Sequence, residues 1–170
     1  MIHGDSLEKA WLKILVYVDK SGILLPEKEL GMREFCNLSF RYANPFLDEV
    51  KKYKKNVPGD YIENLATIYL QQGAGWNGKH YGKYIYDAHG VNQINKVVNI
   101  LKEDPWSKSA IIMFYDGASP KAPCVITLNF SIRSNKLHMN VVFKSSDLVK
   151  KFIPDMLALG AIHTHIAQSL

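Results

Sequence analysis

The stretch from Ala122 to Leu170 reads APCVITLNFSIRSNKLHMNVVFKSSDLVKKFIPDMLALGAIHTHIAQSL. It contains two apolar runs, Cys124–Ile132 and Leu137–Phe143, and the polar pair Ser134-Asn135 lies between them. Runs of this length that are joined by a short polar turn are typical of a β-hairpin. The stretch therefore predicts a hairpin, then a short basic-polar loop ending in Asp147, then a C-terminal helix.

The rest of the chain alternates between helical and strand patterns. Apolar residues recur at helical spacing in Asp5–Lys20, Tyr61–Gln72 and Val91–Glu103, and apolar strand patterns cover Arg33–Tyr42 and Ala110–Tyr115. The last helix is expected from Asp147 to about Ala167, and it should start or bend at Pro154 because proline disrupts a helix interior. This order predicts an α+β fold in a single domain, 1–170, with a mixed β-sheet flanked by helices.

Composition limits the class of protein. The chain has 170 residues, of which 47% are hydrophobic and 22% charged, as in ordinary globular domains that bury a core. It contains no run of about 18 apolar residues, so we expect no membrane span. The start lacks a basic region followed by an apolar stretch, so we expect no signal peptide and a cytoplasmic location.

Charge and metal-ligand patterns narrow the choice of partner. The net charge of +5 fits an anionic small molecule, whereas the lysine run 51–55 is expected to be a solvated loop or helix end. No nucleic-acid-binding motif accompanies that run. His163 and His165 are two residues apart and cannot share a helix face, and neither cysteine has metal-ligand spacing with a histidine. We therefore predict no metal site, and reduced thiols at Cys36 and Cys124.

Cys124 is the most informative residue of the opening stretch. A lone cysteine on an apolar strand is ordinarily a small core residue. Here Pro123 precedes it, and Lys144-Ser145-Ser146-Asp147 follows one hairpin later. This order resembles the active-site half of the thymidylate synthase superfamily, in which Pro-Cys carries the nucleophile and Arg-Ser-x-Asp follows. The resemblance implies that Cys124 is the nucleophile, in thiolate form, with Lys144 replacing the arginine beside it.

Two more segments carry the resemblance. Tyr81-Gly82 follows the glycine-rich loop Gly73–Gly78, and in the family this tyrosine helps to hold ordered water in the active site. The segment Glu103–Ser109 resembles the family's Asp-Pro-x-Ser-Arg-Arg, whose arginines reach across a dimer to the substrate phosphate. Lys108 and Ser109 stand at those two positions here, and lysine cannot reproduce a bidentate arginine contact.

The remaining site residues follow from the same likeness. Ser145 would contribute to phosphate binding and Asp147 to binding of the pyrimidine ring, although Asp147 is equally suited to a helix N-cap. Asp155 lies eight residues after Asp147, where thymidylate synthases have an asparagine that reads uracil. An aspartate there is typical of the cytidylate-hydroxymethylating branch, because a carboxylate accepts from a 4-amino group. The alternative is a helix-start acid that interacts with the helix dipole.

The resemblance implies a sheet-packed homodimer that uses 5,10-methylenetetrahydrofolate to transfer a one-carbon unit to carbon 5 of a pyrimidine nucleotide. Cytidylate is the expected substrate, and hydroxymethylation is favoured over methylation. The likeness runs best from Trp76 to Leu170; it places neither the first phosphate arginine nor the loop glutamate, for which only Glu63 is a candidate. The family's C-terminal segment is not matched. A non-catalytic nucleotide-binding or interaction protein on the same scaffold therefore stays open.

Overall fold

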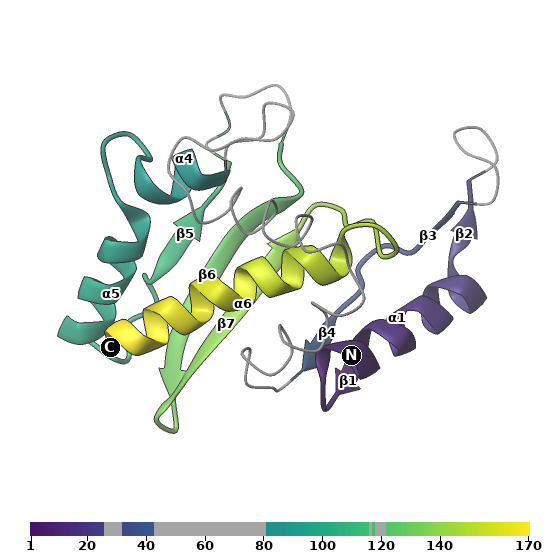
Figure 1. Cartoon of the computed structure of the whole chain (residues 1–170), viewed down its shortest axis with the longest axis horizontal. Helices are drawn as coiled ribbons and strands as arrows, with labels where there is room; N and C mark the ends of the chain where they lie inside the picture. The colour runs from purple at the N-terminus through teal and green to yellow at the C-terminus, as the bar shows by residue number, and fades with distance from the viewer. Residues whose placement is uncertain (26–31, 43–80, 116, 118–121) are drawn as a thin grey trace.

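The computed structural model describes residues 1–25, 32–42, 81–115, 117 and 122–170 (Figure 1). The elements are β1 (Ile2–Gly4), α1 (Leu7–Ser21), β2 (Ile23–Leu24), β3 (Arg33–Glu34), β4 (Phe40–Tyr42), α4 (Tyr81–Tyr86), α5 (Gln93–Glu103), β5 (Ile111–Met113), β6 (Val125–Arg133), β7 (Lys136–Phe143) and α6 (Phe152–Ser169). This mixture of helices and sheet confirms the α+β class. The expected helix Tyr61–Gln72, the polar connector Lys51–Gly59, the loop Gly73–Gly78 and Glu63 lie outside the described residues.

Strands of the described part form three sheets rather than the single sheet expected. β1 pairs with β4 in parallel, β2 pairs with β3 antiparallel, and the largest sheet has the antiparallel order β5-β6-β7. The expected strand Arg33–Tyr42 is divided into β3 and β4 because Asn37 has a left-handed backbone, with φ of 60°. A residue in that conformation interrupts an extended strand.

The predicted hairpin is confirmed. β6 and β7 begin their pairing at Arg133 and Lys136, on either side of the two-residue turn Ser134-Asn135. Both turn residues have positive φ, 51° and 58°, which is the geometry that matches the twist of the flanking strands. A register shift between Val125 and Thr127 disturbs the ladder at the opposite end, directly after Cys124.

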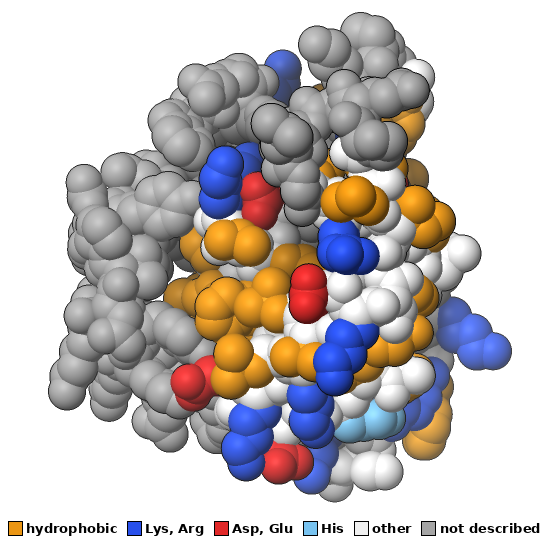
Figure 2. All heavy atoms as spheres, turned by 90° about the vertical axis from the view of Figure 1, so that its right-hand side faces the viewer, with side chains coloured by type: hydrophobic (Ala, Val, Ile, Leu, Met, Phe, Trp, Pro, Cys, Tyr) orange, Lys and Arg blue, Asp and Glu red, His pale blue; other side chains and the backbone are white. Residues whose placement is uncertain are grey.

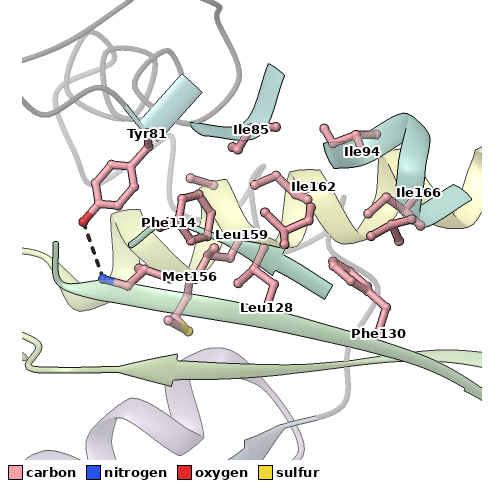
Figure 3. Packing of buried hydrophobic residues seen from close by; sticks show 14 of the residues in the cluster. Tyr81, Ile85, Ile94, Phe114, Leu128, Phe130, Met156, Leu159, Ile162 and Ile166 are labelled. Carbon is pink, nitrogen blue, oxygen red and sulfur yellow. Dashed lines mark hydrogen bonds between the residues drawn. The ribbon is translucent and has the colours of Figure 1, made fainter. Parts of the chain in front are cut away.

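The core lies between the β5-β6-β7 sheet and the helices α4, α5 and α6 (Figures 1 and 3). Leu128 and Phe130 point from β6 into it, and α6 is buried without interruption from Pro154 to Gly160. A helix that is buried on all sides along part of its length is enclosed there by the rest of the fold. His163 Nε2 of α6 lies 3.0 Å from the Leu137 carbonyl oxygen and links the helix to β7.

Helix α1 packs on the other side of the molecule, as its pattern predicts. The Ser6 side chain caps it by accepting from the Lys9 amide, and Gly22 ends it. The indole of Trp11 donates to the Leu148 carbonyl oxygen at 2.7 Å, which ties α1 to the segment before α6. Figure 2 shows the outer face at this end of the molecule, where exposed hydrophobic side chains lie among lysine and arginine side chains. The exposed side chains of Leu12, Val16 and Tyr17 belong to α1.

Two helix ends differ from the sequence predictions. α5 begins at Gln93, with Asn92 as its side-chain cap, so Val91 stays outside the helix and is 44% exposed instead of buried. Asp147 does not cap α6: its carboxylate accepts from the amides of Val149 and Lys150 within a turn that precedes the helix.

α6 starts at Phe152, beyond Asp147 and close to Pro154, where the sequence predicted that the helix starts or bends. Lys151 occupies the N-cap position without a side-chain hydrogen bond, and Pro154 lies in the first turn. The first turn has no intrahelical partners for its amides, so the missing amide hydrogen of proline costs little there. None of the helices formed by the described residues has the length and apolar character needed to span a bilayer.

Candidate active site

Cys124 and Tyr81 are brought together, although 43 positions separate them in the chain. Cys124 is half-buried and directly precedes β6. Its backbone amide donates to the Tyr81 hydroxyl oxygen at 3.1 Å, and the Val125 amide donates to the same oxygen at 3.5 Å. Figure 3 shows the Tyr81 side chain reaching from α4 to the backbone of β6. The fold therefore brings Cys124 and Tyr81 into contact, and their catalytic roles stay predictions.

Tyr81 is held as a neutral phenol. It is buried, and its ring packs edge-to-face on Phe114 at a centroid distance of 5.4 Å. Burial raises the pKa of the Tyr81 phenol above its ordinary value of 10.0; the Val125 and Cys124 amides oppose this rise, and electrostatic interactions with Cys124 and Asp155 add to it. Since the oxygen accepts from two amides, its single proton must be donated in another direction.

Lys144 lies beside the backbone of the Pro123-Cys124 segment. Its amide donates to the Cys124 carbonyl oxygen at 2.8 Å, directly after the end of β7. Its ammonium group donates to the Ala122 carbonyl oxygen at 3.1 Å. The side chain thus places a positive charge next to the strand start that carries the thiol.

The carboxylates predicted to read the base occupy different surroundings. Asp155 lies in the first turn of α6 and is only 5% exposed, and its charge acts on Tyr81. Asp147 is exposed in the preceding turn, and Ser145 next to it is exposed as well. The Ser146 hydroxyl is buried and makes no hydrogen bond to the described residues. Cys124, Tyr81, Lys144 and Asp155 therefore form the centre of the candidate site.

Lys108 lies away from this centre in its own chain. The neighbouring Ala110 carbonyl oxygen accepts from the Phe130 amide, six residues along β6 from Cys124. At about 3.4 Å per strand residue, that separation is roughly 20 Å. One chain alone does not bring Lys108 to the thiol.

Gln93 is a residue of this region that the sequence reasoning missed. It is 8% exposed, and its side-chain amide binds the backbone of both Tyr84 and Met113. The available signal was a polar residue four positions before Val97, on the apolar face of the predicted helix. For metals, the described residues contain no group of three or more His, Cys, Asp or Glu side chains suited to hold an ion.

A half-buried cysteine lies at a strand start, a lysine directly follows the adjoining strand, and a buried tyrosine and carboxylate are nearby. A cation beside a cysteine is typical of sites that use a thiol nucleophile. Residues 33–169 match the family model of thymidylate synthase, so the chain belongs to the thymidylate synthase family. Members of this family transfer a one-carbon unit from methylenetetrahydrofolate to carbon 5 of a pyrimidine nucleotide.

Relatives at low identity agree with this membership. A protein named "Putative thymidylate synthase" from Methanosarcina mazei is 24% identical over 187 residues, which cover 100% of this chain and 81% of the relative. A protein of the same name from Methanocaldococcus jannaschii is 24% identical over 187 residues, covering 99% and 82%. The crystal structure of thymidylate synthase from T4 phage is similar with a TM-score of 0.49 and 20% identity over 72% of this chain, and the chain spans 48% of that structure.

Proposed function

We propose that this chain binds a pyrimidine nucleotide and adds the Cys124 thiolate to carbon 6 of the ring. The observation that carries the proposal is the contact between Tyr81 and the Cys124 amide, with the Lys144 ammonium group on the adjoining backbone. Family membership supports the same chemistry. We assign Cys124 and Tyr81 as catalytic residues.

The addition step explains why a cysteine is needed. The thiolate electron pair forms the bond from sulfur to carbon 6, and the electrons of the double bond between carbons 5 and 6 move to carbon 5. Carbon 5 then becomes nucleophilic. If it takes a proton from water and then loses its original hydrogen, elimination of the thiolate restores the ring with the carbon-5 hydrogen exchanged. Tyr81 would hold water close to this carbon.

Substrate contacts follow from the residues around the thiol. Lys144 would favour the thiolate, and Ser145 would bind the phosphate. Asp147 and Asp155 would bind the base, with Asp155 accepting from the 4-amino group of cytosine. On this basis we propose cytidylate as the preferred substrate, with hydroxymethylation favoured over methylation, in the cytoplasm.

The one-carbon donor of the reaction would be 5,10-methylenetetrahydrofolate, a second substrate that must reach the same ring. Cys124 is half-buried and not enclosed, which fits a site open to two molecules. When bound, the folate supplies the electrophilic carbon that the nucleophilic carbon 5 attacks. We assign none of the residues above to the folate.

A homodimer completes the proposed site. The outer face of the β5-β6-β7 sheet carries Ile111, Met113 and Val142 beside polar side chains of Thr127 and Asn140. Packing two such faces together would cover them, as in the family. Lys108, which is remote from Cys124 in its own chain, would then contribute its charge to the phosphate site of the partner.

The test is exchange of carbon-5 tritium into water from CMP, dCMP and dUMP, because exchange needs thiol addition but no folate. We expect release from at least one nucleotide, and most from a cytosine nucleotide. Cys124→Ser should abolish it, and Cys36→Ser, which changes the exposed second cysteine, should leave it unchanged. No release from any of the three, with Cys124→Ser indistinguishable from wild type, would end the proposal.

A second candidate function is nucleotide binding without turnover. Lysine or serine stands where the family has phosphate-gripping arginines, at Lys108, Ser109 and Lys144, and a lysine binds phosphate only as a point charge. Isothermal calorimetry separates the two functions. Nucleotide binding with neither folate binding nor tritium exchange would favour this second candidate.

A further inference from the structure

Gln93 links α4 and β5 through hydrogen bonds of its side chain. Its Nε2 donates to the Tyr84 carbonyl oxygen at 2.6 Å and to the Met113 carbonyl oxygen at 2.8 Å. Its Oε1 accepts from the Met113 amide at 2.9 Å. One buried side chain thus connects α5, α4 and β5.

The contact with Met113 completes the sheet at its edge. Among the strands that the structure describes, β5 pairs with β6 alone, and the Met113 amide and carbonyl point to the other side. The Gln93 amide occupies the place that the backbone of a further strand would take. A buried backbone group without a partner costs free energy, so this pairing fixes β5 and its neighbour Phe114.

The contact with Tyr84 fixes the end of α4. This helix has only six residues, too few to be stable by itself. The Tyr84 carbonyl would normally accept from the amide of Ala88, but that amide donates to the Val91 carbonyl oxygen instead. Gln93 supplies the missing donor and so anchors the helix that begins with Tyr81.

Both contacts converge on the same ring. Tyr81 is carried by α4, and Phe114, which packs on the Tyr81 ring, follows Met113 at the end of β5. The Tyr81 hydroxyl then receives the amides of Cys124 and Val125. We propose that Gln93 is a positioning residue: it sets Tyr81 against the strand start that carries the thiol. The inference deepens the proposed function but rests on hydrogen bonds that do not require a nucleotide.

The test measures coupling between Gln93 and Tyr81. Gln93→Met keeps the length of the side chain and removes all three hydrogen bonds, and it is made in wild type and in Tyr81→Phe. Ile94→Val, the next residue of α5 and also buried, is the matched control for loss of stability alone. The readout is the rate at which iodoacetamide alkylates Cys124, in a Cys36→Ser background without nucleotide.

We expect Gln93→Met and Tyr81→Phe each to raise the alkylation rate about tenfold, because the half-buried thiol becomes more accessible when the strand start loses its anchor; a tenfold change corresponds to about 1.4 kcal/mol. The alkylation rate of the double variant should differ from that of either single variant by no more than about twofold. In variants with ring-¹³C tyrosine, the Cζ signal of Tyr81 should shift in Gln93→Met and stay unchanged in Ile94→Val.

The inference would be overturned if the increases in alkylation rate caused by Gln93→Met and Tyr81→Phe multiplied in the double variant. It would also be overturned if Ile94→Val raised the alkylation rate as much as Gln93→Met. If Gln93→Met does not fold, Gln93→Glu takes its place, since glutamate keeps the acceptor for Met113 but lacks both donors. Coupling in alkylation without any tritium exchange in wild type would support the positioning role while contradicting the proposed function.

Discussion

Tyr81 is the residue on which the site depends most directly. Below about pH 10 the Tyr81 phenol is neutral in both the folded and the unfolded chain. In the folded chain its oxygen then accepts hydrogen bonds from both backbone amides. Because its folded pKa is raised above 10.0, the folded state holds the proton more strongly. The stability linked to this proton is therefore fully present below the unfolded pKa and is lost as the pH rises through the folded pKa.

Tyr81→Phe should consequently cost about 1–3 kcal/mol at neutral pH, since two amides lose their acceptor. The difference from wild type should shrink at pH values above about 10. Urea unfolding from about pH 8 to about pH 11 measures both effects, and Tyr84→Phe, one helical turn later, is the control. A constant difference across the alkaline range would contradict this account of Tyr81.

Asp155 is the residue that we propose to read the base. A buried carboxylate opposite the wrong ring edge leaves a polar group unpaired, which costs about 1–3 kcal/mol, or roughly tenfold to a hundredfold in affinity. Asp155→Asn should shift the ratio of CMP to UMP affinity, and of dCMP to dUMP affinity, towards uracil by that factor. Asp19→Asn, an exposed acid on α1 outside the proposed site, is the comparison. An unchanged ratio for Asp155→Asn would identify it as a helix-start residue only.

At the scale of single residues, the predicted chemical roles stay predictions, and the contacts were foreseen only in part. Cys124 and Tyr81 were predicted together from their motifs, and the fold joins them. The role of Gln93 was not predicted, because its three partners are backbone groups of Tyr84 and Met113, which carry no sequence signal. Asp147 was expected at a helix start, but its carboxylate is used within the preceding turn.

Among the elements, α1 and the segment before α6 depend on one long-range hydrogen bond. Trp11→Phe removes the indole donor to the Leu148 carbonyl oxygen and should destabilise the protein by about 1 kcal/mol. It should also accelerate hydrogen exchange at the Val149 and Lys150 amides, because their turn loses its support. Trp106→Phe, at a position 69% exposed, should change neither quantity. Equal effects of both substitutions would contradict this role of Trp11.

Elements whose signals are local were predicted well. The hairpin depends on two apolar runs and a two-residue turn, all visible in the sequence, and its register agrees. The break at Asn37 was missed because an asparagine tolerates both extended and left-handed backbone, and the surrounding structure decides between them. Val91 was expected in the core because helical periodicity alone does not show that Asn92 caps the helix after it.

For the whole molecule, the proposed dimer makes a specific prediction. Val142 is 51% exposed on the outer sheet face, and Val149 is 77% exposed in the turn before α6. A charge within a face-to-face sheet interface is costly to bury, so Val142→Lys should shift light-scattering mass towards the monomer at micromolar concentration. Val149→Lys should leave the mass unchanged. A monomeric wild type would contradict the dimer and, with it, a role for Lys108 in the partner's site.

The hairpin also has a consequence for the order in which the chain assembles. It closes across only two residues, so little chain entropy opposes it, and hairpins of this kind form within microseconds. The contact of Tyr81 with Cys124 spans 43 residues, and that of Trp11 with Leu148 spans 137. Contacts between distant parts of a chain form slowly. Strand β6, which follows Cys124, should therefore form early in folding. The hydrogen bond between the Cys124 amide and Tyr81 should form only later, with the other long-range contacts.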